Sequence, residues 1–200
     1  ANIYLDNSSN ATVQGNFVTC ASSSDAMKFY RGGKPASGIL MGEESYTGWG
    51  AMLGNVSITN NIIFGCGGIS FYGAEVSPGG LKGAIISNNT LWNISGSRAI
   101  YIASEPQNSA ITITRNIAPG TVSSGAGIAA VDNLQSATFS TIPDAGVMSS
   151  FTLKTGTNGY ATHGFQSDQA LMPSDTVSTG TNQKNSADLD MNGTVNIFDY

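Results

Sequence analysis

Short apolar segments alternate with small polar residues along most of this chain, and one such segment occurs three times. Residues 56–61, 84–89 and 111–116 mix Ile, Val or Ala with Ser or Thr, and each segment ends in Asn. The closing Asn recurs at intervals of 28 and 27 residues. A fixed period near this length is typical of solenoids, propellers and other repeat arrays. The repeat therefore predicts an architecture before it predicts any chemistry.

Two further apolar series accompany this segment. One precedes it and begins at residues 2, 38, 68, 99 and 127; the other follows the Asn, at residues 17–18, 62–64 and 90–92. None of the three series has the 3.6-residue period of a helix. We therefore predict an all-β fold in which about five to six coils, each of three short strands, stack as a single-stranded parallel β-helix.

The recurring Asn has a physical role in this arrangement. A sharp bend between the second and third strands requires a residue in the left-handed region, which Asn adopts at a lower cost than other non-glycine residues. Asn residues at the same place in adjacent coils can also hydrogen-bond along the stacking axis. We expect such a ladder to be formed by Asn16, Asn61, Asn89 and Asn116.

These repeats resemble those of the right-handed parallel β-helix proteins of the pectate-lyase type. The resemblance covers roughly residues 1–155 and rests on the repeat pattern rather than on a catalytic signature. It implies a right-handed helix and a polysaccharide lyase or glycoside hydrolase activity, although one fold hosts many activities. We assign residues 1–165 to the β-helix, with 137–141 and 150–154 as last coils or an end cap, and the polar residues 166–187 to a linker.

Strand alternation predicts which residues face outward. If the apolar residues of the first series point into the core, the outward positions are Tyr4, Leu40, Ser70 and Tyr101, followed by Asp6, Gly42, Tyr72 and Ala103. This face is aromatic and nearly uncharged. A hydrolase of polygalacturonase type needs clustered carboxylates, and a lyase needs a base and a cation, so the predicted face counts against catalysis on the strands.

The catalytic candidates therefore lie in loops. Lys28 and Arg31 belong to one loop, and Glu43 and Glu44 to the loop one coil later. Basic groups beside carboxylates could supply a base and a cation site for an acidic sugar. The alternative is a solvated surface ion pair, which contributes little.

Aromatic residues near the same loops are candidates for binding sugar rings. A stacking platform could be formed by Tyr46, Trp49, Tyr72 and Tyr101. The alternative is that Trp49 covers a coil edge and that the tyrosines fill a stacked external row. His163, the one histidine of the chain, lies after the repeats and is expected to be structural.

The two cysteines follow the third strand of neighbouring coils. Stacked strands bring such Cα atoms to about 4.8 Å, which lies within the range of a disulfide. Cys20 and Cys66 differ by about one residue in their position after the Asn. A disulfide and two buried thiols therefore both remain open.

The last residues form a calcium-loop pattern. Oxygen-bearing side chains occupy positions 1, 3, 5, 9 and 12 of a loop, with Gly193 at the sharp turn. The pattern, with Asp rather than Glu at its end, resembles a type I dockerin repeat. The resemblance implies Ca²⁺ bound by Asp188, Asp190, Asn192, Thr194, Asn196 and Asp199. A dockerin needs two such loops, so we expect residues 188–200 to be a fragment that binds Ca²⁺ weakly.

The composition and charge of the chain argue against two kinds of partner, nucleic acids and the interior of a membrane. The chain has 200 residues, 10% of them charged, and a formal net charge of −5. It lacks the basic stripe of a nucleic-acid-binding protein and the run of ~20 apolar residues of a membrane span. Its first residues, which read as the middle of a strand, indicate missing upstream sequence.

Two functions follow as expectations. The first is an extracellular carbohydrate-associated module that binds polysaccharide or cell-surface glycan, and also a cohesin-like protein through a complete tail. The second is a structural stalk, adhesin or filament subunit on the cell surface, with other copies of the chain as partners.

Overall fold

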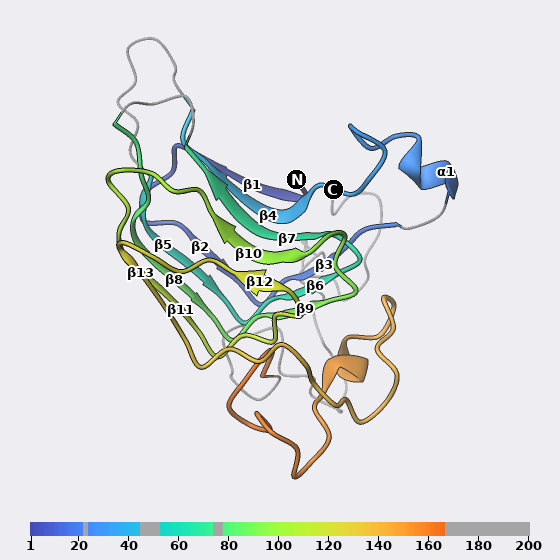
Figure 1. Ribbon diagram of the computed structural model, residues 1–200. Helices are drawn as coiled ribbons and strands as arrows, with labels where there is room; N and C mark the ends of the chain where they lie inside the picture. The colour runs from blue at the N-terminus through green and yellow to red at the C-terminus, as the bar shows by residue number, and fades with distance from the viewer. Residues whose placement is uncertain (22–23, 45–52, 74–77, 167–200) are drawn as a thin grey trace, which may run out of the picture. The chain divides into compact units, whose positions relative to one another are not determined.

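The structure, a computed structural model, describes residues 1–21, 24–44, 53–73 and 78–166. These residues form one compact unit that ends at Gln166. It is mostly β, with parallel sheets, as the sequence predicts (Figure 1). Successive passes of the chain add strands to three sheets, here called A, B and C.

Sheet A has five parallel strands, in the order β1 (Ile3–Asp6), β4 (Ser37–Gly42), β7 (Gly67–Tyr72), β10 (Arg98–Ile102) and β12 (Thr121–Val122). Sheet B has the order β13 (Ile128–Val131), β11 (Ser109–Thr114), β8 (Lys82–Ser87), β5 (Gly54–Thr59) and β2 (Thr12–Gln14). Sheet C contains β3 (Phe17–Thr19), β6 (Ile62–Phe64) and β9 (Thr90–Trp92). Two short helical turns, α1 (Ser24–Met27) and η1 (Met148–Phe151), complete the described elements.

The inward and outward positions of sheet A agree with the alternation in the sequence. The register aligns Ile3, Ile39, Ile69 and Ile100 in one row, and Leu5, Met41, Phe71 and Ile102 in a second. Both rows belong to or pack against the apolar core. The row between them contains Tyr4, Leu40, Ser70 and Tyr101, which are exposed or half-buried. Burial of the two aliphatic rows thus fixes which side chains sheet A presents outward.

The predicted asparagine ladder is present, and it extends one pass further, to Asn133. In its centre, Asn61 donates its backbone N–H to Asn89 Oδ1 at 3.0 Å and its side-chain amide to the same oxygen at 2.9 Å. Asn89 repeats both bonds with Asn116, and Asn116 repeats them with Asn133. Asn61, Asn89 and Asn116 are fully buried. Their polar groups hydrogen-bond to one another and to nearby carbonyls, so burying them leaves no donor or acceptor without a partner.

The expectation that the ladder residues themselves take the left-handed bend is wrong. The residue before each ladder position has the positive φ: Gly15 at 69°, Asn60 at 56°, Asn88 at 54°, Arg115 at 54° and Asp132 at 54°. The side-chain amide of the ladder Asn then spans this bend, as when Asn89 donates to Ser87 O at 3.1 Å. One residue therefore turns the chain, and the next closes the turn and joins it to the neighbouring pass.

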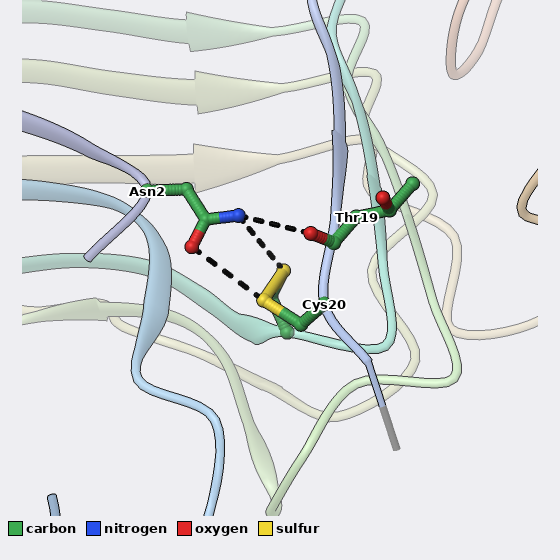
Figure 2. Close-up of a disulfide and its surroundings, with 4 residues drawn as sticks. Asn2, Thr19 and Cys20 are labelled. Atoms are coloured by element: carbon green, nitrogen blue, oxygen red, sulfur yellow. Dashed lines mark hydrogen bonds between the residues drawn. A yellow bond between two sulfur atoms is a disulfide. The ribbon is translucent and has the colours of Figure 1, made fainter. Parts of the chain in front are cut away.

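Cys20 and Cys66 form a disulfide, with Cα atoms 4.9 Å apart. Gly65, at φ 73°, is the additional residue that separates Phe64 from Cys66 and absorbs the offset between the two passes. Figure 2 shows the side chain of Asn2 against the sulfurs, with its amide nitrogen 3.0 Å from the carbonyl oxygen of Thr19. The disulfide thus joins the ends of β3 and β6, next to the start of β1.

Residues 137–141 and 150–154, expected to be last coils or an end cap, add no strands to the three sheets, so the first alternative is wrong. Phe139 and Leu153 form an antiparallel bridge instead. Phe151 packs with its ring centroid 5.5 Å from those of Phe17 and of Phe64, and Phe139 packs 4.8 Å from Trp92. The outer face of sheet C bears these large aromatic side chains, and covering them removes apolar surface from water.

Residues 159–166 run along the bends between sheets B and C. Asn60 donates to Gln166 O at 3.1 Å, and Asn88 donates to Thr162 O at 2.9 Å. His163 is buried, with Nε2 3.0 Å from Asp132 Oδ1. The contacts of this histidine are those of a packed structural residue.

Candidate functional site

A carboxylate and two phenols meet on the outer face of sheet A. Glu44 follows the end of β4, Tyr4 belongs to β1, and Tyr72 ends β7. Tyr72 donates its hydroxyl to Glu44 Oε1 at 2.8 Å, and Tyr4 donates to the same oxygen. The two phenolic oxygens are 3.1 Å apart. We call Tyr4, Glu44 and Tyr72 the tyrosine–glutamate cluster.

Two neighbours explain how the sequence builds this cluster. Gly42 lies opposite Tyr72 in the register, and a Cβ atom there would collide with the ring of Tyr4. The glycine therefore leaves room for Tyr4 to reach across β4. Asn7 holds the backbone of Glu44, since it accepts the Glu44 N–H at 3.0 Å and donates to the Glu44 carbonyl at 2.8 Å. These two bonds hold the backbone from which the carboxylate projects.

The surroundings of Tyr4 keep its phenol protonated. Partial burial, the hydrogen bond to Glu44 and the neighbouring Tyr72 all raise the pKa of Tyr4. Tyr4 therefore remains a neutral donor at physiological pH. A carboxylate flanked by two phenols presents acceptor oxygens beside aromatic faces, and this combination suits the hydroxyl groups and C–H faces of a sugar.

Glu43, the residue before this carboxylate, points the other way. It is 4% exposed, and its Oε2 accepts the Gly80 N–H at 2.7 Å. It lines a cavity of about 290 Å³ together with Asn10, Leu53, Asn55, Gly80 and Lys82. Burial raises the pKa of Glu43 and the charge of Glu105 adds to this, whereas the Gly80 hydrogen bond and Lys82 act in the opposite direction. A buried carboxyl of this kind can hold a proton that ordinary glutamates release.

Glu43 should give the fold a characteristic pH dependence. A carboxyl whose folded pKa is raised binds its proton more tightly in the folded state, so the free energy of unfolding falls as pH rises above about 4.5, the ordinary value for Glu. We expect Glu43→Gln to remove this fall, giving a variant that is more stable than the parent at neutral pH and not at acid pH. Urea denaturation across this pH range measures it.

Glu105→Gln provides a graded control for this prediction. Because the charge of Glu105 raises the pKa of Glu43, removing that charge should reduce the fall in stability without abolishing it. Parallel stability curves for the parent and the Glu43→Gln variant would contradict the prediction.

The basic pair and the carboxylates predicted to act together lie at opposite ends of β4. Lys28 and Arg31 precede β4 whereas Glu43 and Glu44 follow it, so a strand of six residues, roughly 20 Å long, separates the two pairs. Arg98 lies over the ring of Tyr101, with Cζ 4.4 Å from the ring centroid. Tyr46 and Trp49 lie outside the described residues, and so do the calcium-loop candidates 188–199.

Two features escaped the sequence reasoning. Tyr4 appeared only as an outward residue, because nothing in the sequence shows that its ring crosses Gly42 to reach Glu44. A second hollow, of about 530 Å³, lies beside sheet C and is lined by Phe64, Trp92, Ile94, Pro119, Ile142 and Pro143. Its outer wall comes from residues 137–154, whose packing the sequence does not indicate.

The described residues lack two further features. No group of three or more His, Cys, Asp and Glu side chains is placed to hold a metal ion there. That part of the chain also contains no helix long and apolar enough to cross a membrane.

No protein-family model, curated protein or solved structure matches this chain.

Proposed function

We propose that this chain is an extracellular right-handed parallel β-helix that binds polysaccharide on the outer face of sheet A. Three parallel sheets built by successive passes of the chain, and an unbroken asparagine ladder, support the β-helix. The disulfide supports an extracellular location, because disulfides persist in oxidising compartments. In this proposal the linker begins after Gln166, which is buried in the folded unit, and runs to residue 187, while 188–200 belong to a calcium-binding, dockerin-like segment that attaches a cohesin-like partner when complete.

The tyrosine–glutamate cluster is the observation that carries the binding proposal. Aromatic side chains stack on the apolar faces of sugars, while a carboxylate orders their hydroxyl groups. Here all three side chains meet on the outer face of sheet A, and a glycine and an asparagine fix their positions. An elongated glycan could extend from the cluster along the row that contains Leu40, Ser70 and Tyr101. The same surface would serve a lyase or hydrolase whose other catalytic groups lie outside the described residues.

The test is the binding of soluble polysaccharides to the full chain, measured by calorimetry with a neutral glucan, a xylan and polygalacturonate. Hydrogen bonds to a charged group contribute about 1.5–3 kcal/mol, so Glu44→Gln should weaken binding roughly tenfold or more. Gly42→Ala should weaken it as well, although all three side chains remain, because the added methyl group displaces Tyr4. Tyr160→Phe, at an exposed tyrosine away from sheet A, is the control.

The binding results decide whether sheet A is the polysaccharide site. Retained secondary structure with selective loss of binding in the two sheet A variants supports the proposal. If the parent chain binds none of the three polymers, or if both variants bind as the parent does, the proposal is wrong.

The asparagine ladder favours a second function, that of a rigid cell-surface stalk or filament subunit. Its bonds connect every pass in the same register from Asn16 to Asn133, so bending one pass against the next would break several of them together. Electron microscopy should then show elongated assemblies that grow with protein concentration. Discrete monomers at all concentrations would argue against a filament.

A further inference from the structure

The cavity beside Glu43 is lined by a buried carboxyl group with one oxygen that lacks a partner among the described residues. The Oε2 atom of Glu43 accepts the Gly80 N–H at 2.7 Å. Gly73 leaves room for this carboxyl, because a Cβ atom there would lie 3.0 Å from Oε2. No described residue donates to the other oxygen, Oε1. Since every fully buried side-chain nitrogen or oxygen of the described residues has a partner, Oε1 reaches water, and the cavity that Glu43 lines gives it that access.

The charges around this oxygen leave it without a counter-ion. Lys82 lines the same cavity, but the described residues contain no ion pair between Lys82 and Glu43. Glu105 adds a second negative charge, which raises the pKa of Glu43 further. A buried carboxylate that lacks a counter-ion destabilises the fold, so a bound cation that reaches Oε1 would relieve this cost.

The rest of the lining suits a small polar molecule. The cavity, of about 290 Å³, lies at the small end of ligand sites and has room for a molecule the size of a single sugar. Asn55 donates its amide nitrogen to Asn10 Oδ1 at 3.2 Å, which leaves Asn55 Oδ1 as an acceptor. Leu53 is buried and adds an apolar wall. A ligand with hydrogen-bond donors and some C–H surface would therefore meet matching groups.

We propose that this cavity binds the primary ammonium group of a small polar molecule, either an amino sugar or a simple amine. The ammonium group donates to Glu43 Oε1 and to Asn55 Oδ1, and its charge supplies the counter-ion. A calcium ion fits less well, because the described lining contains one carboxylate, whereas calcium takes about six to eight oxygen ligands. The inference does not depend on polysaccharide binding by sheet A, since Glu43 and Glu44 point in opposite directions.

The test is calorimetry of the full chain with D-glucosamine and, as a control, with glucose, which has the same ring without the amine. We expect glucosamine to bind and glucose to show no measurable binding. N-acetylglucosamine, whose nitrogen carries no charge, should behave as glucose does. Ethanolamine separates the two sources: an affinity equal to that of glucosamine assigns the cavity to small amines in general, and tighter binding of glucosamine assigns it to amino sugars.

Glu43→Gln is the central variant, because it keeps the shape of the side chain and removes its charge. Hydrogen bonds to charged groups are the strong ones, so the variant should bind glucosamine at least about tenfold more weakly. It is also expected to be more stable than the parent at neutral pH. Loss of binding would therefore not reflect loss of the fold, which circular dichroism checks.

Lys82 gives a prediction of the opposite sign. At neutral pH, Lys82→Gln removes a cation that repels the ligand, so glucosamine should bind roughly two- to fivefold more tightly at low ionic strength, and the gain should shrink in salt. Glu105→Gln should weaken binding by a similar factor. Lys154→Gln, at an exposed lysine elsewhere on the described surface, is the matched control and should change nothing. An anionic ligand would reverse the first two signs.

Binding should also depend on pH, because Glu43 must release its proton before it can hold an ammonium group. Burial and the charge of Glu105 raise the pKa of Glu43, whereas the Gly80 N–H and Lys82 act in the opposite direction. The net shift is upward from 4.5, so the affinity for glucosamine should increase between about pH 4 and 7. Glu43→Gln should show no such increase.

Four results would overturn the inference. They are equal binding of glucosamine and glucose by the parent (including none of either), unchanged binding by Glu43→Gln, weaker binding by Lys82→Gln, and loss of binding in Glu44→Gln but not in Glu43→Gln. The last result would place the amine at the tyrosine–glutamate cluster instead of in the cavity. Failure of the polysaccharides to bind sheet A would leave the glucosamine results unaffected, so the two proposals fail separately.

Discussion

Replacing Asn89 by alanine is expected to lower the free energy of unfolding by about 4 kcal/mol, since several buried polar groups lose their partners at about 1–3 kcal/mol each. The Asn89 side chain accepts from the backbone and the side chain of Asn61, at 3.0 and 2.9 Å. It donates to Asn116 Oδ1 and to Ile58 O, both at 2.9 Å. Alanine replaces none of these contacts, and the site is fully buried.

Two further variants calibrate this result. Asn133, the last ladder residue, is only half-buried, so water can reach the groups that Asn133→Ala exposes and the loss should be about 1–2 kcal/mol. Asn158, which is exposed and outside the ladder, should tolerate alanine to within about 0.5 kcal/mol. Urea denaturation measures all three. A ladder variant no less stable than Asn158→Ala would mean that the ladder does not hold the passes together.

The fold is predictable from the sequence where side-chain alternation and burial agree. Ile39, Ile69 and Ile100 occupy one inward row because shifting any of the strands by one residue would expose its whole apolar set. The ladder was likewise visible, because Asn61, Asn89 and Asn116 recur at nearly constant spacing. Which residue takes the positive φ at the bend could not be predicted. Adjacent residues such as Asn60 and Asn61 are identical in sequence, and only their contacts show that the first forms the bend and the second the ladder.

The candidate site was predictable only in part. Alternation placed Tyr4 and Tyr72 outward, and the loop position singled out Glu43 and Glu44, but the meeting of Tyr4, Tyr72 and Glu44 depends on a ring that crosses Gly42. The opposite directions of Glu43 and Glu44 depend on the path of the chain after β4. The alternation of residues along a strand predicts neither the path of the Tyr4 ring nor the direction of each glutamate side chain. Lys28 and Arg31 were grouped with these carboxylates because the two loops were expected in successive coils, which ignores that one loop enters β4 and the other leaves it.

Loss of the disulfide between Cys20 and Cys66 is expected to lower the thermal stability of the fold strongly. Its two cysteines are separated by 46 positions in the chain, and the loop-entropy relation gives a stabilisation of about 4 kcal/mol for a loop of that size. We therefore expect Cys20→Ala/Cys66→Ala to lower the unfolding midpoint by roughly 10 °C, as measured by calorimetry, since a domain of this size loses about 2–4 °C per kcal/mol.

Reduction of the parent chain distinguishes the covalent link from the packing of the cysteine side chains. A reductant should lower the midpoint of the parent and leave the double variant unchanged; an unchanged parent midpoint would show that the link contributes nothing. When the disulfide is reduced, local opening should begin at β3, a strand of only three residues at the edge of sheet C. Asn16, the ladder residue beside β3, is only half-buried, so water reaches its bonds to the second pass more easily than those of the fully buried ladder residues. Hydrogen exchange should therefore quicken at Val18 and Thr19 before it quickens at Ile63, whose strand is paired on both sides.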